Sequence, residues 1–112
     1  MEIIKEDSKG IILLHISGYM VADTIDSLKK VISQFQGTEK NRVILNLEKV
    51  KMIDSSGIGA IAFMIKRFRG TGGDLKIANA KGNVAEIFEI TKLYKTIDMY
   101  NSLKEAAESS WS

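Results

Sequence analysis

The hydrophobic positions of this 112-residue chain alternate between the spacing of strands and the spacing of helices. The largely apolar segments 3–5 and 10–17, joined by the turn-forming sequence Asp-Ser-Lys-Gly at 7–10, predict two strands connected by a turn. Residues 42–47 are almost continuously aliphatic, which indicates a strand covered on both faces. Two further strands are predicted at residues 75–78 and 96–100.

Between the later strands, apolar residues recur every three or four positions, as in helices that bury one face. Residues that cap helices well precede these segments, and glycines at positions 37 and 70 end the first two. The four predicted helices begin after Asp23 or Thr24, at Ile58, after Asn83 and after Ser102.

The order of these elements predicts an α/β fold with right-handed crossovers between parallel strands. We expect a single mixed, mostly parallel sheet of about five strands, with about four helices mainly on one face. The chain contains no proline, repeat or low-complexity tract that would mark a linker between domains. Residues 1–112 are therefore expected to form one domain.

The charge balance gives little reason to expect a nucleic acid or a membrane as partner. The 16 basic and 14 acidic side chains leave a net charge of +2, with no strong basic cluster. No apolar run approaches the roughly 20 residues that cross a bilayer. The N-terminal residues are charged and lack the apolar core of a signal peptide, so a cytoplasmic protein is expected.

The side chains that carry most enzymatic chemistry are scarce. The chain has no cysteine, which excludes disulfides, thiolate metal sites and thiol catalysis. Its single histidine, His15, lies within an apolar strand and is expected to be a half-exposed strand residue. No pair of carboxylates is placed for acid–base work. We therefore expect no enzymatic activity, no metal and no cofactor.

The most informative segment is residues 52–59, Met-Ile-Asp-Ser-Ser-Gly-Ile-Gly, between the aliphatic strand and the second predicted helix. A helix N-terminus presents unpaired backbone N–H groups and the positive end of its dipole. The Asp54 carboxylate and the hydroxyls of Ser55 and Ser56 would lie at that point. Helix capping alone would explain these residue types. The same arrangement suits a phosphate, either bound there or added covalently to a serine.

Two glycine-rich segments have formal likenesses to nucleotide-binding loops. The stretch 57–62 satisfies the dinucleotide fingerprint, but residues 51–56 intervene between it and the preceding strand, and no acidic residue ends the next strand. The glycines at 70, 72 and 73 precede a strand and are not followed by Lys-Ser or Lys-Thr, so a turn is the better interpretation. A small nucleotide-binding domain remains a third hypothesis, which predicts saturable binding of ATP, GTP or NAD.

A strand followed by Asp54-Ser55-Ser56-Gly57-Ile58 and an apolar helix resembles the STAS-domain anti-sigma factor antagonists. The resemblance covers nearly the whole chain and implies the STAS fold. It also implies that Ser55, directly after the aspartate, is the phosphorylated serine. A partner surface would surround it. The residues expected there are Asp54, Ser56, Gly57, Ile58, Met20, Asp23, Phe63 and Met64.

In the resembling family, the unphosphorylated antagonist binds an ATP-dependent serine kinase that acts as anti-sigma factor, and a sigma factor is released. The kinase then phosphorylates the antagonist, and a PP2C-type phosphatase restores it. The resemblance thus implies a kinase and a phosphatase as partners of a chain that is a monomer when unbound. Phosphorylation of Ser55 would add about −1.5 to −2 charges in the middle of the partner surface.

The chain departs from the family pattern at two loops. Val21 stands where the family usually carries an aspartate near the phosphorylated serine, and Lys92 stands where it often has a glycine. Asp23 could replace the missing carboxylate unless it serves as a helix cap. The valine favours an alternative: a STAS partner-switch or scaffold protein that regulates a phosphatase, a motility or secretion output, or a transporter complex without a sigma factor.

Overall fold

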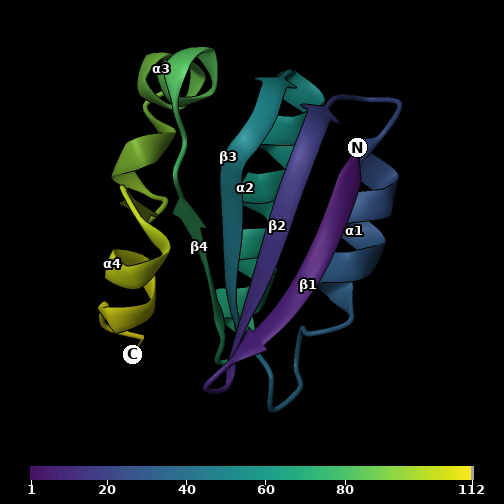
Figure 1. Cartoon of the computed structure of the whole chain (residues 1–112). Coiled ribbons are helices and arrows are strands. Elements are labelled where there is room, and N and C mark those ends of the chain that lie inside the picture. Colours follow the sequence, from purple (N-terminus) through teal and green to yellow (C-terminus); the bar gives the residue numbers. More distant parts are fainter. Residues whose placement is uncertain (112) are drawn as a thin grey trace.

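Five strands form one sheet whose spatial order, β1-β2-β3-β4-β5, follows the sequence (Figure 1). The computed structural model describes residues 1–111. β1 pairs antiparallel with β2, and all later pairs are parallel, so the predicted mixed, mostly parallel sheet is confirmed. The elements are β1 Glu2–Ser8, β2 Ile11–Met20, α1 Ile25–Ser33, β3 Arg42–Ile53, α2 Ser55–Gly70, β4 Asp74–Ala78, α3 Gly82–Ile90, the short 3₁₀ helix Leu93–Lys95, β5 Met99–Tyr100 and α4 Leu103–Glu108.

The main hydrophobic core lies between one face of the sheet and helices α1, α2 and α3. In Figure 1, α1 and α2 lie together behind the sheet. Alternate residues of β2 and β3 point into this core, as the period of a strand requires. The fully buried residues include Ile12, Leu14, Val43, Leu45, Ile61 and Phe68.

Helix α4 packs on the opposite face of the sheet, so three of the four α-helices within residues 1–111 share one face and the fourth does not. Ala106 of α4 is buried in a second, smaller cluster with Leu13, Ile44 and Ala78. These strand residues alternate with those of the main core, which is why the strands looked apolar on both faces. Helix α4 has six residues, too few to cover the whole face.

A lysine is buried on the α4 side of the sheet. The Lys76 side chain is fully buried, and its Nζ donates to Ser109 Oγ at 2.6 Å and to the Ser110 carbonyl oxygen at 2.5 Å. The ring of Trp111 lies 4.3 Å from the same nitrogen. The segment after α4 therefore packs over the ammonium group, in a cation–π arrangement.

The predicted end of the third strand was wrong, because β3 continues through Ile53. Relative to β2, its pairing partners step from Asn46 to Lys49 and from Val50 to Met52, so β3 carries an extra residue twice. Such bulges bend a strand and interrupt its alternation. Residues 48–49 and 51–52 are consequently all exposed, whereas Val50 is buried. β2 likewise runs through Met20, in place of the predicted connection from Gly18.

Other predicted boundaries shift by a few residues. Helix α2 begins at Ser55 and not at Ile58. Lys81, not Asn83, is the N-cap of α3, and β5 has only the two residues Met99–Tyr100 of the predicted strand 96–100. Thr24 is the N-cap of α1, but its Oγ1 accepts from the Val21 N–H instead of a helical N–H. Local turn and capping hydrogen bonds of this kind move helix and strand ends without changing their order.

Candidate functional site

The Asp54 side chain connects two loops at the end of the sheet. Its Oδ1 accepts a hydrogen bond from the Gly57 N–H at 3.0 Å, which caps α2. Its Oδ2 accepts one from the Ala22 N–H at 3.2 Å in the loop before α1. The backbone N–H of Asp54 also donates to the Met20 carbonyl oxygen at 3.3 Å. Asp54 is thus the N-cap of α2, and it holds the β2–α1 loop against that helix.

Ser55 and Ser56 are the first two residues of α2, and both are exposed. The Asp54 side chain occupies the Gly57 N–H, and the Ile58 N–H bonds to the Asp54 carbonyl oxygen at 3.0 Å. The exposed positive end of the 16-residue helix is therefore formed around the two serines. A phosphate on either hydroxyl would be close to that positive end.

Gly57 is required by close packing between the loop and the sheet. A Cβ atom at this position would lie 2.4 Å from the Met20 carbonyl oxygen and 2.7 Å from Cγ1 of Ile53. These distances are well below ordinary contact. The glycine therefore lets α2 begin directly against the ends of β2 and β3, and this close approach fixes where the serines lie.

Packing does not require a glycine at position 59, because a Cβ there would have no neighbour within 4 Å. It is exposed, one turn after Ser55 and Ser56. Phe63 follows one turn later and is 53% exposed, with the Arg67 guanidinium 5.4 Å from its ring centre. Helical spacing places these residues on one outer stripe of α2 that starts at the serines.

The structure separates the predicted partner residues into exposed and buried groups. Asp23, Ser56 and Phe63 are exposed, and Asp54 is half-buried. Met20 and Met64 are 0% and 3% exposed, so their assignment to the partner surface was wrong and they belong to the core. Gly57 and Ile58 are also buried. They support the site from beneath but offer a partner little surface.

Sequence reasoning missed Tyr19 and Met52, which are 48% and 43% exposed. The two are paired across β2 and β3, next to the buried pair of Met20 and Ile53. Strand alternation would have indicated Tyr19, had β2 been extended through Met20. Met52 gave no such signal, because a bulge precedes it.

His15 takes part in a polar network on the sheet face opposite the main core. It is partly exposed, as predicted, and its Nε2 lies 2.9 Å from Glu6 Oε1. Its Nδ1 lies 2.9 Å from Asn46 Nδ2, and Asn46 Oδ1 accepts from Asn79 Nδ2 at 3.0 Å. Both ring nitrogens are thereby engaged within the sheet, as in a structural histidine.

Comparison with known proteins agrees with this architecture. The STAS domain family model matches residues 2–106. An anti-sigma F factor antagonist of Paenibacillus polymyxa is 22% identical over 103 residues, covering 91% of this chain and 88% of that relative. Within residues 1–111, no helix is long and apolar enough to cross a membrane.

Two solved structures share the fold. An anti-sigma factor antagonist from Mycobacterium paratuberculosis has a TM-score of 0.83 at 21% identity, covering 95% of this chain and 90% of that one. The phosphorylated form of the Bacillus cell fate determinant SpoIIAA has a TM-score of 0.72 at 20% identity, covering 96% and 97%. At these identities the two structures demonstrate a common fold, and the site must be argued from its own residues.

Proposed function

The chain belongs to the STAS domain family, and from this premise we propose that it is an anti-sigma factor antagonist controlled by phosphorylation of Ser55. In its unphosphorylated form it binds an anti-sigma serine kinase, and a sigma factor is released. The kinase uses ATP to phosphorylate Ser55, and a PP2C-type phosphatase removes the phosphate. The chain itself performs no catalysis. The observation that carries the proposal is the exposed Ser55 hydroxyl at the first position of α2.

The geometry around Ser55 suits a switch that leaves the fold unchanged. A phosphate there would add about −1.5 to −2 charges at the positive end of α2, where the helix dipole favours an anion. Both Asp54 side-chain oxygens already accept backbone hydrogen bonds, so the loops around the serine stay in place. The partner surface would nevertheless become strongly anionic.

The effect of that charge on a partner can be estimated. An interface formed around a neutral hydroxyl would have to desolvate the phosphate without a matching cation. Couplings of about 1–3 kcal/mol are usual in such switches and change affinity about 5- to 150-fold. We therefore expect phosphorylated and unphosphorylated forms to differ in kinase affinity by a factor within that range.

Val21 favours a second candidate function, regulation of a phosphatase, a motility or secretion output, or a transporter complex without a sigma factor. The Val21 side chain has no carboxylate to bring to the serines, and its backbone N–H and carbonyl are engaged in the turn with Thr24. Asp23 is exposed in the same loop. A partner other than an anti-sigma kinase would suit this altered loop.

Intact mass and fragment mapping test the proposal after the protein is incubated with ATP and an extract of its own cells. One phosphate should appear on Ser55, and the Ser55→Ala variant should remain unmodified. Ser56→Ala is the matched control, because Ser56 is the neighbouring exposed hydroxyl on the same helix turn. Phosphate on Ser55→Ala, or none on the wild type in an extract that phosphorylates other proteins, would reject the assignment.

A further inference from the structure

We propose that the ends of β2 and β3 form a second contact surface for the same kinase, on the sheet face opposite α1 and α2. This basic-apolar surface consists of Tyr19 and Met52 with Lys49 and Lys51. The occupant it fits is an acidic face of the kinase with an apolar side chain at its centre. The proposal rests on the proposed function, because it takes the kinase of Ser55 as its partner.

Two apolar side chains form the centre of the surface. Tyr19 and Met52 are direct neighbours across the β2–β3 pair and are 48% and 43% exposed. The next pair, Met20 and Ile53, is buried in the main core, so Tyr19 and Met52 point to the opposite face. Adjacent exposed apolar residues at the end of a sheet are typical of interaction surfaces.

The bulges of β3 produce the surface. Each extra residue turns part of the strand outward, and of residues 48–52 only Val50 reaches the core. A regular strand would have buried alternate side chains here. Bulges often re-aim side chains beside functional sites. In this chain the bulged half of β3 leads directly to Asp54 and Ser55.

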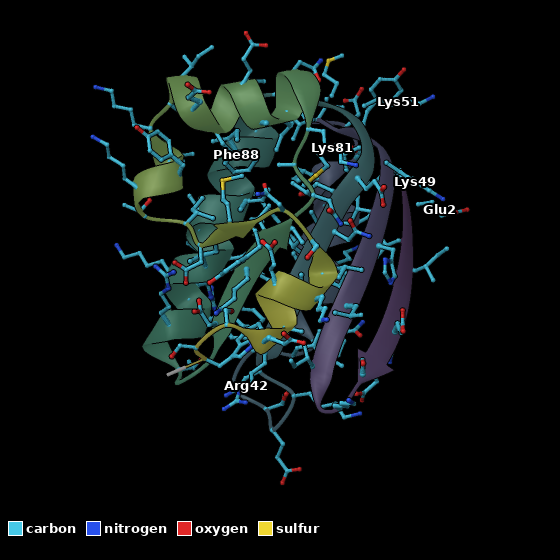
Figure 2. The ribbon with its side chains drawn as sticks, turned by 60° about the vertical axis from the view of Figure 1, so that its left-hand side comes forward. Glu2, Arg42, Lys49, Lys51, Lys81 and Phe88 are labelled. Atoms are coloured by element: carbon cyan, nitrogen blue, oxygen red, sulfur yellow. The ribbon has the colours of Figure 1, made fainter. Side chains whose placement is uncertain are left out.

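The four residues of this surface carry two positive charges and no negative charge, and Glu2 lies beside Lys49 at its margin (Figure 2). Within residues 1–111, no carboxylate oxygen lies within 4.0 Å of the ammonium group of Lys49 or Lys51. The neighbouring carboxylate of Glu48 pairs instead with Lys81, at 3.4 Å. Figure 2 shows Lys49 and Lys51 projecting at the same end of the sheet, with Arg42 at the other end. Two unpaired lysines beside an apolar pair complement an acidic partner.

The sheet face beside this surface is hollowed and uncovered. One hollow of about 550 Å³ is lined by β2 and β3 at Ser17, Gly18 and residues 48–51. A second hollow of about 410 Å³ adjoins it and shares Ser17, Glu48 and Lys49, with Leu103 of α4 at its margin. Helix α4 thus stops short of this part of the sheet. A protruding partner side chain could enter there.

Phosphorylation of Ser55 would act on this surface as well. Met52 precedes Ser55 by only three residues. At physiological ionic strength, charges still interact over about 8–10 Å, so a phosphate on Ser55 would act on this surface. An acidic kinase face would be repelled by the phosphate and would lose part of its attraction to the lysines. One modification would therefore weaken both contacts.

The test uses kinase purified by its Ser55-phosphorylating activity and measures initial phosphorylation rates on the full chain. The double variant Lys49→Glu with Lys51→Glu should raise KM at least about tenfold and leave kcat unchanged. An increase of this size lies in the usual range of coupling between sites, about 5- to 150-fold. Tyr19→Ser with Met52→Ser should do the same. Added salt should weaken binding of the wild type more than that of the lysine variant.

The control variants are a double charge reversal, Lys95→Glu with Lys104→Glu, and one apolar-to-serine change, Ile90→Ser, all at exposed positions outside the surface. Thermal melting verifies that each variant is folded. Wild-type kinetics in both surface variants, or equal losses in the controls, would overturn the surface and leave the Ser55 switch standing. A wild type that receives no phosphate would reject the proposed function, and this inference with it.

Discussion

The Asp54 carboxylate accepts a hydrogen bond from the Ala22 N–H at 3.2 Å, although the two residues are 32 positions apart in the sequence. Its second oxygen caps α2 through the Gly57 N–H. One side chain therefore fixes both the β2–α1 loop and the beginning of the helix that carries Ser55. The aspartate of the motif has a structural task in addition to any contact with a partner.

Substitution of this aspartate should lower stability in a graded way. Asp54→Ala removes the cap and the bond to the β2–α1 loop, and loss of a cap alone costs about 0.5–2 kcal/mol. Asp54→Asn keeps one acceptor oxygen and should fall between the wild type and the alanine variant. Urea unfolding checks this order. An alanine variant as stable as the wild type would show that neither bond stabilises the fold.

Gly57→Ala should destabilise the protein by about 3 kcal/mol, in the upper part of the usual cost of overpacking. The added Cβ would lie 2.4 Å from the Met20 carbonyl oxygen, which belongs to the backbone and cannot move aside cheaply. The start of α2 would have to shift away from the sheet. Thermal unfolding measures the loss, and an unchanged melting temperature would mean that the loop and helix are packed less closely than described.

Gly59→Ala should have the opposite sign and stabilise the protein by about 0.5–1 kcal/mol, because alanine favours a helix interior over glycine. The added Cβ meets no atom within 4 Å. If the outer stripe of α2 contacts the kinase, the same change should slow phosphorylation of Ser55. Equal melting temperatures of this variant and the wild type would contradict the expected stabilisation. An unchanged rate of Ser55 phosphorylation would contradict the contact between this stripe and the kinase.

The fold could largely be predicted because the period of apolar residues is a local property of the sequence. The order of strands and helices followed from it, including the hairpin formed by β1 and β2. The second half of β3 could not be predicted in this way. Its two extra residues leave 48–49 and 51–52 exposed, so neither a strand nor a helix period remains.

The candidate site was predictable only where it depends on adjacent residues. Ser55 and Asp54 could be placed from the motif, because a helix start fixes their relation. Met20 and Met64 were misplaced for reasons of tertiary structure. Extension of β2 by a few residues puts Met20 on the core face and Tyr19 outside. Met64 lies at the flank of the apolar stripe of α2 and is buried in the main core, to which α1 also contributes.

Lys92→Gly should raise stability by about 0.5–1 kcal/mol. Lys92 has a φ of 59°, in the left-handed region that costs a side-chain-bearing residue about 1–2 kcal/mol. Glycine removes this cost but loses more conformational entropy on folding, about 0.4–1 kcal/mol. Urea unfolding measures the difference. The control is Lys95→Gly, at a nearby exposed position whose φ is negative. This change should be destabilising. A Lys92→Gly variant less stable than the wild type would contradict the strain argument.

Lys76→Met should loosen the segment after α4 while leaving the domain nearly as stable as before. Methionine fills a similar volume, and replacing a buried charge with an apolar side chain is often neutral or stabilising. The change removes the Nζ bonds to Ser109 and Ser110 and the ammonium 4.3 Å from the Trp111 ring. Trp111 is the single tryptophan, so its fluorescence reports on this segment alone. Acrylamide should quench it more strongly in the variant, with a change in unfolding free energy below about 1 kcal/mol.

Lys76→Ala separates packing from charge at the same position. Truncation would leave a cavity in the cluster beneath α4 and should cost about 2–5 kcal/mol, as for other large buried side chains. The order of stability is then wild type and Lys76→Met together, with Lys76→Ala well below. If Lys76→Met were as unstable as Lys76→Ala, the ammonium group itself, held between Ser109 Oγ and the Trp111 ring, would have to stabilise the folded domain. If quenching were also unchanged in Lys76→Met, the segment would be held by the Trp111 Nε1–H bond to the Ala107 carbonyl oxygen at 3.1 Å and not by the lysine.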